Sequence, residues 1–255
     1  MPLELVTIPC RSDNYAFLVH EAASGETALV DAPEAGPILA ELERRGWTLS
    51  SVLLTHHHLD HVEGLGRLLD AHSARVVGAK ADAHRLPPLD QAVVEGDTVS
   101  VGGEEGRVLD VSGHTVGHIA FHFPDSGLAF TGDSLMALGC GRIFEGTPEM
   151  MWNSLGKLAA LPGDTRICSG HEYTTKNANF AAIIEPDNAE LKARRARIDE
   201  ARAEGRPTVP SKLAEELATN PMLRAHLPDV KEAVRMAGAS DVEVFAEIRH
   251  RRDGY

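Results

Sequence analysis

Thr55-His56-His57-His58-Leu59-Asp60-His61 directly follows the apolar run Ser51-Val52-Leu53-Leu54. A short apolar run of this kind predicts a buried strand. Because alternate side chains of an extended chain point to the same side, His56 and His58 can face one metal ion. The same alternation turns His57 away, so we expect packing or a hydrogen bond as its role.

Asp60 and His61 follow at the expected start of a helix, from which they can reach a second ion. Imidazole and carboxylate are ligands of zinc, manganese or iron, and such a set without thiolate differs from a structural zinc finger. A histidine-rich surface turn is the alternative interpretation. The spacing of Asp60 and His61 favours the metal site.

Further along the chain, three segments share a pattern in which an apolar strand ends in a ligand-type residue beside glycine. They are Val111-Ser112-Gly113-His114, Phe130-Thr131-Gly132-Asp133 and Cys168-Ser169-Gly170-His171. A rigid strand can aim the side chain carried by the loop that follows it. One such segment alone is typical of a turn or a cap, but together with the histidine run they indicate a metal centre.

Short apolar segments bounded by Gly, Asp and Ser predict strands in the first two thirds of the chain. The predicted strands span residues 3–9, 15–20, 27–30, 51–55, 75–78, 107–111, 119–123, 128–131 and 165–169. Helical patterns span residues 35–45, 62–72 and 149–161. Sheets with few intervening helices predict an α/β layered sandwich, with two sheets packed together and helices outside.

The pattern changes after about Glu172, where helical periodicity is interrupted by prolines. The predicted helices span residues 188–205, 211–219, 229–236 and 242–250. Periodic segments separated by proline predict a small helical domain. We therefore expect a larger domain over residues 1–172 and a helical domain over residues 173–255.

The formal net charge of −13 argues against nucleic acid as a partner, because phosphate binding needs a basic surface. A small anionic substrate is still compatible, since a few local cations or a metal can hold it. Cys10, Cys140 and Cys168 form no CxxC pair, which favours reduced thiols and a cytoplasmic location. We see no signal-peptide pattern, and no apolar run approaches the roughly 20 residues that span a bilayer, so we expect no membrane partner.

The histidine run resembles the HxHxDH signature of the metallo-β-lactamase superfamily, and the order of His114, Asp133 and His171 matches it too. Within that superfamily the chain is similar to the glyoxalase II, or hydroxyacylglutathione hydrolase, family. The supporting stretches are residues 12–15 (SDNY), 113–118 (GHTVGH), 130–135 (FTGDSL), 139–147 (GCGRIFEGT) and 170–174 (GHEYT). The last two are more specific than HxHxDH. The resemblance covers essentially the whole chain and implies a four-layer αββα sandwich with a C-terminal substrate-binding domain.

The resemblance also implies a role for each ligand-type residue. One metal ion would be bound by His56, His58 and His114, the other by Asp60, His61 and His171, and Asp133 would bridge them. Two divalent ions are implied, with zinc as the first choice and iron or manganese as alternatives, since imidazole and carboxylate suit all three. His118 is expected to support the site without ligating.

The implied reaction is hydrolysis of S-(2-hydroxyacyl)glutathione, such as S-D-lactoylglutathione to D-lactate and glutathione, the second step of methylglyoxal detoxification. A hydroxide that bridges two metals would attack, because metal lowers the pKa of bound water to about 7. A thiol has a pKa of about 8.5, so thiolate leaves without a dedicated general acid. Asp60 could also orient the hydroxide, as a catalytic role beside ligation.

Glutathione carries carboxylates, and the resemblance implies that Arg142, Phe144, Tyr173, Arg249 and Arg252 bind it. Arg249 and Arg252 share one face of the last predicted helix, although a solvated basic tail is the alternative from residue type alone. Some relatives have Lys in place of Arg142 and Tyr in place of Phe144. Since Phe144 has no hydroxyl, we expect substrate binding weaker by roughly 1 kcal/mol at that contact.

Two other functions remain as alternatives. The first is a persulfide dioxygenase of the same superfamily, which uses one iron bound by two histidines and an aspartate. The second is a metal-binding or scaffold protein without activity. The complete ligand set and the arginines of the last helix favour the hydrolase, which we expect to be a monomer with a small-molecule glutathione thioester as its only partner.

Overall fold

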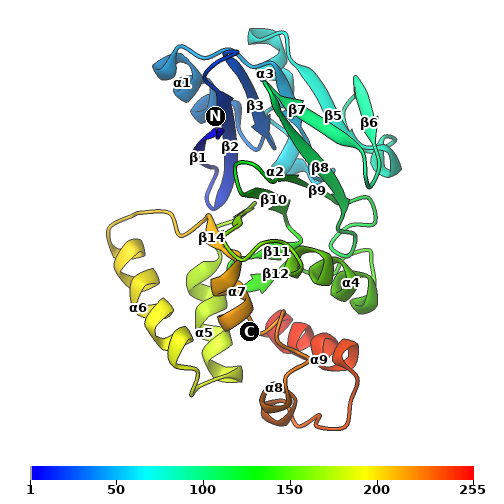
Figure 1. Ribbon diagram of the computed structural model, residues 1–255, viewed down its shortest axis with the longest axis vertical. Helices are drawn as coiled ribbons and strands as arrows, with labels where there is room; N and C mark the ends of the chain where they lie inside the picture. Colours follow the sequence, from blue (N-terminus) through cyan, green and yellow to red (C-terminus); the bar gives the residue numbers. More distant parts are fainter. Residues whose placement is uncertain (1) are drawn as a thin grey trace.

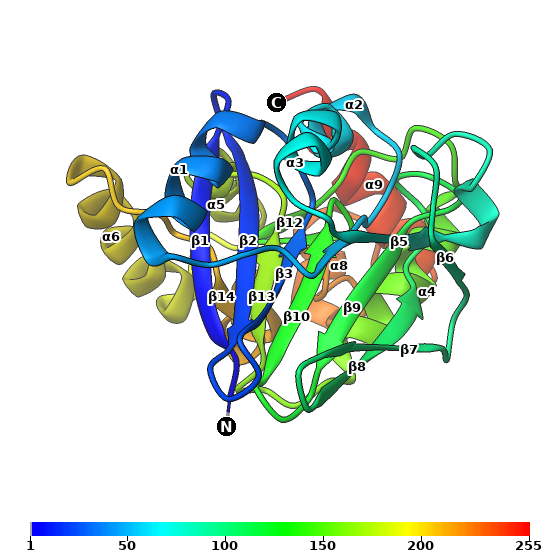
Figure 2. The same cartoon turned by 90° about the horizontal axis from the view of Figure 1, so that it is seen from above.

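The computed structural model describes residues 2–255 and has two β-sheets packed face to face, with helices on both outer sides (Figure 1, Figure 2). The first sheet has the order β1 (Glu4–Cys10), β2 (Asn14–Glu21), β3 (Glu26–Val30), β4 (Ser51–Leu53), β5 (Arg75–Ala79), β6 (Gln91–Val93). Its β1–β2–β3 part is antiparallel, and its β3–β4–β5–β6 part is parallel.

The second sheet has the order β14 (Ser211–Lys212), β13 (Arg166–Ser169), β10 (Leu128–Gly132), β9 (Ile119–Phe123), β8 (Glu104–Asp110), β7 (Thr98–Val101). Its pairs are antiparallel except for β10 with β13, which is parallel. A short hairpin follows β10 and consists of β11 (Leu135–Met136) and β12 (Gly139–Cys140). β14 belongs to the C-terminal part of the chain, so that part completes the second sheet.

The helices of the first half are α1 (Ala35–Arg45), α2 (Leu59–Val62), α3 (Leu65–Ala71) and the 3-10 turn η1 (Lys80–Asp82). Those of the second half are α4 (Pro148–Ala159), α5 (Thr174–Ile184), α6 (Ala189–Ala203), α7 (Leu213–Thr219), α8 (Pro228–Ala233) and α9 (Asp241–Asp253). Among residues 2–255, no helix has the length and apolar character that crossing a membrane requires.

Three apolar clusters lie between neighbouring layers and pack them together. Phe17, Phe121 and Phe130 are buried between the two sheets, and the rings of Phe17 and Phe130 lie 5.6 Å apart. On the outer face of the first sheet, Leu42 of α1 and Leu68 of α3 pack in a second cluster. A third cluster joins the outer face of the second sheet to α4, α5 and α9. This order of layers confirms the predicted αββα sandwich.

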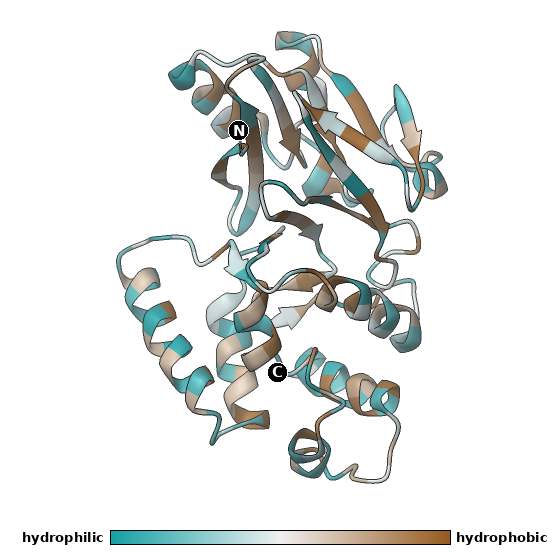
Figure 3. Cartoon of the chain, viewed as in Figure 1, coloured by the Kyte–Doolittle hydropathy of each residue, from teal (hydrophilic) through white to brown (hydrophobic). Residues whose placement is uncertain are grey.

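Hydropathy follows this arrangement. Figure 3 shows strands such as β2 and β3 largely in brown, because both faces of the first sheet are covered. By contrast, α6 carries much teal, and its buried residues are confined to Leu191, Arg194, Ile198 and Ala201. Strands of a sheet that is covered on both faces are apolar at nearly every position, and β2 and β3 follow this pattern.

Some predicted elements differ from the structure. The single helix predicted over residues 62–72 is divided into α2 and α3, because Gly64 lies against the backbone near Ala32 and Ala35. Its backbone N–H donates to the Ala32 carbonyl at 2.8 Å, and a Cβ there would meet Ala35 N at 2.7 Å. The helix predicted over residues 211–219 begins only at Leu213, because Ser211 and Lys212 pair with β13.

Candidate metal centre

The ligand-type side chains meet where several strands end. His56 and His58 follow β4, Asp133 follows β10, and His171 follows β13. Asp60 and His61 lie on α2, and His114 lies on the loop between β8 and β9. Their ligand atoms form three groups, each within 4.8 Å: His56, His58, His114; Asp60, His61, His171; and His56, His61, Asp133. The fold therefore brings together every residue that the sequence indicated as a ligand.

Asp133 lies between the two outer groups. Its Oδ2 is 3.4 Å from His114 Nε2 and 3.3 Å from His171 Nε2, whereas its Oδ1 is 3.5 Å from His61 Nε2. Oδ1 is also buried and has no hydrogen-bond partner within residues 2–255. An orphaned carboxylate oxygen among imidazoles is the arrangement that a bridging metal ligand needs.

Asp31 fixes the orientation of two of the histidine rings. His61 Nδ1 donates to Asp31 Oδ2 at 2.8 Å. The Thr55 hydroxyl donates to the same carboxylate at 2.8 Å, so its oxygen accepts from His56 Nδ1 at 3.0 Å. Because both Nδ1 protons are donated to Thr55 and Asp31, the Nε2 atoms of His56 and His61 carry free lone pairs that face the centre.

Two other rings are oriented in the same way. His114 Nδ1 donates to the Arg142 carbonyl at 2.6 Å, and His171 Nδ1 donates to Asp13 Oδ1 at 3.0 Å. Their Nε2 atoms therefore also point inward. Hydrogen bonding at the far nitrogen sets the tautomer of a metal-binding imidazole and raises its basicity.

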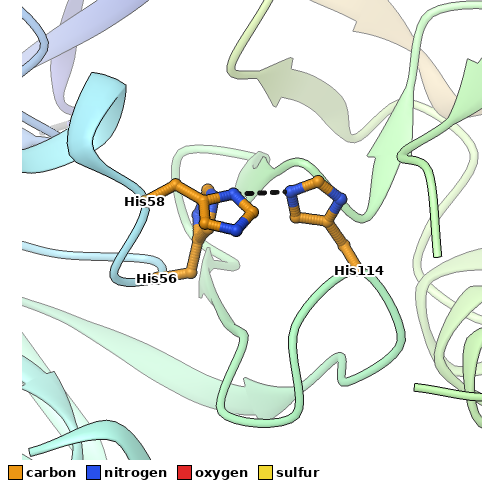
Figure 4. Close-up of side chains that lie close together, drawn as sticks. All are labelled: His56, His58 and His114. Carbon is orange, nitrogen blue, oxygen red and sulfur yellow. Dashed lines mark hydrogen bonds between the residues drawn. The ribbon is translucent and has the colours of Figure 1, made fainter. Parts of the chain in front are cut away.

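The inward nitrogens crowd together, as Figure 4 shows for His56, His58 and His114. His58 Nδ1 lies 3.1 Å from His56 Nε2 and 3.0 Å from His114 Nε2. Because neighbouring lone pairs repel unless a cation or proton lies between them, this donor set fits divalent metal. The residues present thus fit the two divalent ions that the resemblance implies.

The electrostatics keep most of these groups in the form that binds metal. Burial lowers the pKa of His56 well below its usual value, and burial also lowers that of His114. Burial would raise the pKa of Asp133, but the imidazoles of His171 and His61 hold it well below the usual range. Neutral imidazole and ionised carboxylate are the ligand forms.

Two histidines, His61 and His171, differ from the others of the centre. Burial lowers the pKa of His61, but the charges of Asp133 and Asp31 outweigh this and raise it. His171 follows the same pattern. Burial lowers its pKa, but the negative charge of Asp133 outweighs this and raises the pKa to about 9. Asp133 thus attracts positive charge to this position, and a metal ion would replace the proton that it attracts. Binding of a metal ion to the His171 ring would therefore release that proton.

Three residues support the centre without joining a ligand group. His57 Nδ1 lies 2.9 Å from Asp82 Oδ2. His118 is fully buried, and its Nε2 accepts from the Asp133 backbone N–H at 3.0 Å. The Asn14 amide donates at 3.1 Å to both the carbonyl oxygen and Oδ2 of Asp60.

A cleft opens from this centre toward α5 and α9. Five ligand residues line it: His58, Asp60, His114, Asp133 and His171. The other lining residues are Arg142, Phe144, Tyr173, Lys176, Asn177, Arg249 and Arg252, together with Met136, Cys140 and Gly141. All of the residues that the resemblance implies for substrate binding lie in this cleft, and their role in binding stays a prediction.

Two aromatic rings line the cleft beside the ligands. The Tyr173 ring stacks on His171, with centroids 4.7 Å apart and planes 7° apart. The Phe144 ring meets the edges of His58 and His114 at 5.8 and 5.3 Å, and the residue is 60% exposed. Phe144 therefore presents an apolar wall at the mouth of the cleft.

The terminal arginines are not a solvated tail. Arg249 is buried, and its NH1 donates to the Cys140 carbonyl at 2.8 Å. Arg252 donates through Nε and NH2 to Asn177 Oδ1 at 3.1 and 3.0 Å. The capping box of Ser240 and Glu243 begins α9 and so sets the turn on which both arginines lie.

Sequence reasoning missed several residues of the site. Asp31 orients His61, Asp13 orients His171, and Lys176 and Asn177 line the cleft. Asp31 directly follows the apolar segment Thr27–Val30, so the strand-end pattern could have identified it. Asp13 belongs to a stretch that carries the family resemblance.

Comparison with known proteins adds two family models that divide the chain. Residues 12–171 match the metallo-beta-lactamase superfamily, and residues 172–255 match the hydroxyacylglutathione hydrolase C-terminus. A hydroxyacylglutathione hydrolase of Cereibacter sphaeroides is 68% identical over 255 residues, which cover 100% of each chain.

Two solved structures show the same fold. The BLEG-1 B3 metallo-beta-lactamase has a TM-score of 0.68 at 19% identity, and the match covers 86% of this chain and 99% of that one. ETHE1 from Myxococcus xanthus has a TM-score of 0.65 at 26% identity, with 99% and 90% covered.

Proposed function

The chain belongs to the hydroxyacylglutathione hydrolase family of the metallo-β-lactamase superfamily, and we propose on this basis that it hydrolyses S-(2-hydroxyacyl)glutathione thioesters with two divalent metal ions. One observation carries the proposal. A single cleft is lined both by residues of the histidine and aspartate cluster and by several cationic side chains. The reacting carbonyl and the carboxylates of glutathione lie at a distance from each other, and this cleft offers a partner to each.

The ligand residues would hold the metals as two sites that share Asp133. His56, His58 and His114 form one site, and Asp60, His61 and His171 form the other. When bound, two divalent ions supply an acidified water near neutral pH and polarise the substrate carbonyl. We propose zinc as the first choice; the mixed imidazole and carboxylate set also suits iron and manganese, so metal analysis must separate the three.

The protein groups around the ligands have their own tasks. Asn14 holds the Asp60 carboxylate by a hydrogen bond of 3.1 Å, which supports a second role of Asp60 in orienting the attacking oxygen. The cleavage forms a carbon–oxygen bond, breaks the carbon–sulfur bond and releases glutathione as thiolate. Since a thiol has a pKa of about 8.5, the thiolate leaves without a separate acid. Cys140 is no nucleophile, because burial raises the pKa of its thiol.

The arginines of the cleft support recognition of glutathione. Arg suits carboxylate because its planar fork of donors is permanently charged. Arg142, Arg249 and Arg252 line the cleft together with Lys176, and the exposed Phe144 supplies apolar contact in place of a hydroxyl. We therefore propose S-D-lactoylglutathione as a substrate, with D-lactate and glutathione as products, in the second step of methylglyoxal detoxification.

The structure does not favour the alternative of a mononuclear iron dioxygenase. Such a site needs two histidines and one aspartate, whereas this chain brings together three overlapping ligand groups and a cation-lined cleft. The full-length likeness at 68% identity is likewise to a hydroxyacylglutathione hydrolase.

We further propose a monomer in the cytoplasm with no nucleic-acid or membrane partner. The net charge of −13 supports the absence of a nucleic-acid partner. All of the cysteines, which lie within the described residues, are free and buried, as expected of a chain in a reducing compartment.

The test combines metal analysis with an assay of the thioester. Purified protein is expected to contain about two metal ions per chain and to remove the thioester absorbance of S-D-lactoylglutathione. Asp133→Asn should lose both properties. One iron per chain, together with oxygen uptake on glutathione persulfide, would support the dioxygenase instead.

A further inference from the structure

Asp253, in the last turn of α9, joins two arginines of the cleft through a single oxygen. Its Oδ1 accepts from Arg249 NH2 at 2.9 Å and from Arg142 Nε at 3.1 Å. The two arginines come from distant parts of the sequence, since Arg142 follows β12 and Arg249 lies one helical turn before Asp253. One carboxylate therefore connects the loop after the hairpin to the C-terminal helix.

The two bonds are not equivalent. Arg249 is 7% exposed, and the Cys140 carbonyl also holds it, so it is a fixed anchor for Asp253. The Arg142 side chain is 55% exposed and would otherwise be free to move. Because a flexible arginine loses conformational freedom when it binds a ligand, holding it beforehand favours binding.

The atom through which Arg142 is held matters most. Asp253 takes only Nε, and within residues 2–255 the terminal nitrogens of Arg142 have no hydrogen-bond partner. The Phe144 ring lies under the guanidinium, with Arg142 Cζ 5.8 Å from its centroid. A carboxylate can accept two parallel bonds from guanidinium nitrogens, so the fork of Arg142 stays available at the cleft.

We propose that Asp253 is a positioning residue, which holds Arg142 by Nε so that its terminal nitrogens bind a carboxylate of the glutathione thioester. The inference rests on the proposed function for the identity of the ligand. A competing role for Asp253 is to occupy the arginines and so oppose the substrate. The two roles predict opposite changes in affinity when Asp253 is removed.

The experiment compares Asp253→Ala, Asp253→Asn, Arg142→Ala and the double variant Asp253→Ala/Arg142→Ala. For Asp253→Ala we expect KM for S-D-lactoylglutathione to rise about 3- to 10-fold, with kcat within about twofold, because one orienting contact is lost. Asp253→Asn keeps an acceptor oxygen and should fall between wild type and Asp253→Ala. The double variant should bind no worse than Arg142→Ala, since Asp253 acts through Arg142.

Glu247→Ala is the matched control. Glu247 pairs with Arg251 at 2.8 Å on the same helix with the same i, i+4 spacing, and neither residue lines the cleft. It should leave KM unchanged. Thermal unfolding of all variants separates a loss of folding from a loss of positioning.

The dissociation constant of S-methylglutathione, measured by calorimetry, tests the inference without turnover. It should rise in Asp253→Ala by the same factor as KM. An unchanged or lower KM in Asp253→Ala, or additive effects in the double variant, would overturn the positioning role while the hydrolase assignment stands. A wild-type protein that binds S-methylglutathione but cleaves no thioester would overturn only the hydrolase, and one that does neither would overturn both.

Discussion

Asp31 Oδ2 accepts a hydrogen bond from His61 Nδ1 at 2.8 Å, which ties a carboxylate outside the ligand set to a ligand inside it. The same carboxylate accepts from the backbone N–H of Thr55 at 2.8 Å and from its hydroxyl. Asp31 is 3% exposed, and its carboxylate acts only as an acceptor. It therefore fixes both the β4 end and the His61 ring.

Replacement of Asp31 by Asn should weaken the site that contains His61. One carboxylate oxygen becomes an NH2 group, which donates and cannot accept. This group would face another donor, either the Thr55 backbone N–H or His61 Nδ1, so one of the two hydrogen bonds is lost. Loss of such a partner commonly costs 10- to 100-fold in metal affinity or activity, and we expect a loss of about that size. The backbone φ of 56° at Asp31 suits Asn, so backbone strain does not confuse the result.

The measurement is the metal content per chain after dialysis, together with activity against added zinc. Asp70→Asn, at an exposed position of α3, serves as the control. An Asp31→Asn variant that retains both ions and full activity would show that His61 needs no orientation.

Removal of metal should abolish activity and make the structure less stable. The inward nitrogens of His56, His58 and His114 lie within hydrogen-bond distance, and a cation relieves their repulsion. A chelator is expected to remove activity, and added zinc, iron or manganese should restore it to different extents. Stability should rise with metal concentration, because a ligand of the native state shifts unfolding by mass action. A melting temperature unaffected by metal would contradict this account.

Arg252 should affect substrate affinity more than turnover. It donates to Asn177 Oδ1 at the cleft and belongs to none of the ligand groups. Replacement of Arg252 by Met, alone or with Arg249→Lys, is expected to raise KM by about tenfold and to lower kcat by less, since a bond to a charged group contributes about 1.5 kcal/mol. Arg251→Met, on the outer side of the same helix, should change neither constant. Equal losses in kcat for Arg252→Met would point to a role in the chemical step.

The buried pair of Arg194 and Glu216 should dominate the stability of the helical region. Arg194 donates to Glu216 Oε1, and Glu216 Oε2 accepts from the Leu138 backbone N–H at 2.8 Å. Glu216→Ala leaves a buried charge unpaired and should cost about 3–5 kcal/mol of unfolding free energy. Glu215→Ala removes an exposed pair with Arg197 and should cost about 1 kcal/mol or less. Denaturant unfolding measures both, and equal costs would refute the distinction.

The stability of the protein should fall in acid partly through Glu145. A hydrogen bond from Arg85 lowers the pKa of Glu145 from 4.5 to about 2, although burial opposes the shift. Because the folded pKa is the lower one, the contribution is complete above about pH 4.5 and is lost as the pH falls toward about 2. Glu145→Gln should therefore be less stable than wild type near neutral pH, with a difference that shrinks below that window.

Unfolding in chelator-containing buffers across this pH range gives the measurement. Glu105→Gln, at an exposed position of β8, should show no such trend. A Glu145→Gln difference that stays constant with pH would mean that the carboxylate charge contributes nothing.

Elements and ligand-type residues that a short local sequence pattern defines were predicted from the sequence. The helix predicted over residues 35–45 is confirmed as α1, with Gly46 in the left-handed conformation at its end. The strand-end pattern also identified His114, Asp133 and His171, because a strand followed by glycine and a polar residue is itself a local signal.

Other parts depend on contacts that no local pattern records. Helix α5 was not predicted, because it is covered on several sides and buries polar Thr174 and Asn177 beside Phe180, so it has no periodic apolar face. Asp13 acts on His171 across 158 residues, and Asp31 acts on His61 across 30. Only the folded chain brings these pairs together.

Strand β14 gives the C-terminal region a protective task that is separate from catalysis. By pairing with β13, Ser211 and Lys212 cover an edge of the second sheet. A truncated chain that ends at residue 171 would expose β13 as an open edge, which is a template for pairing with other chains and for aggregation. Grafts of helical regions between relatives should therefore transfer the segment that contains β14 as well as the helices.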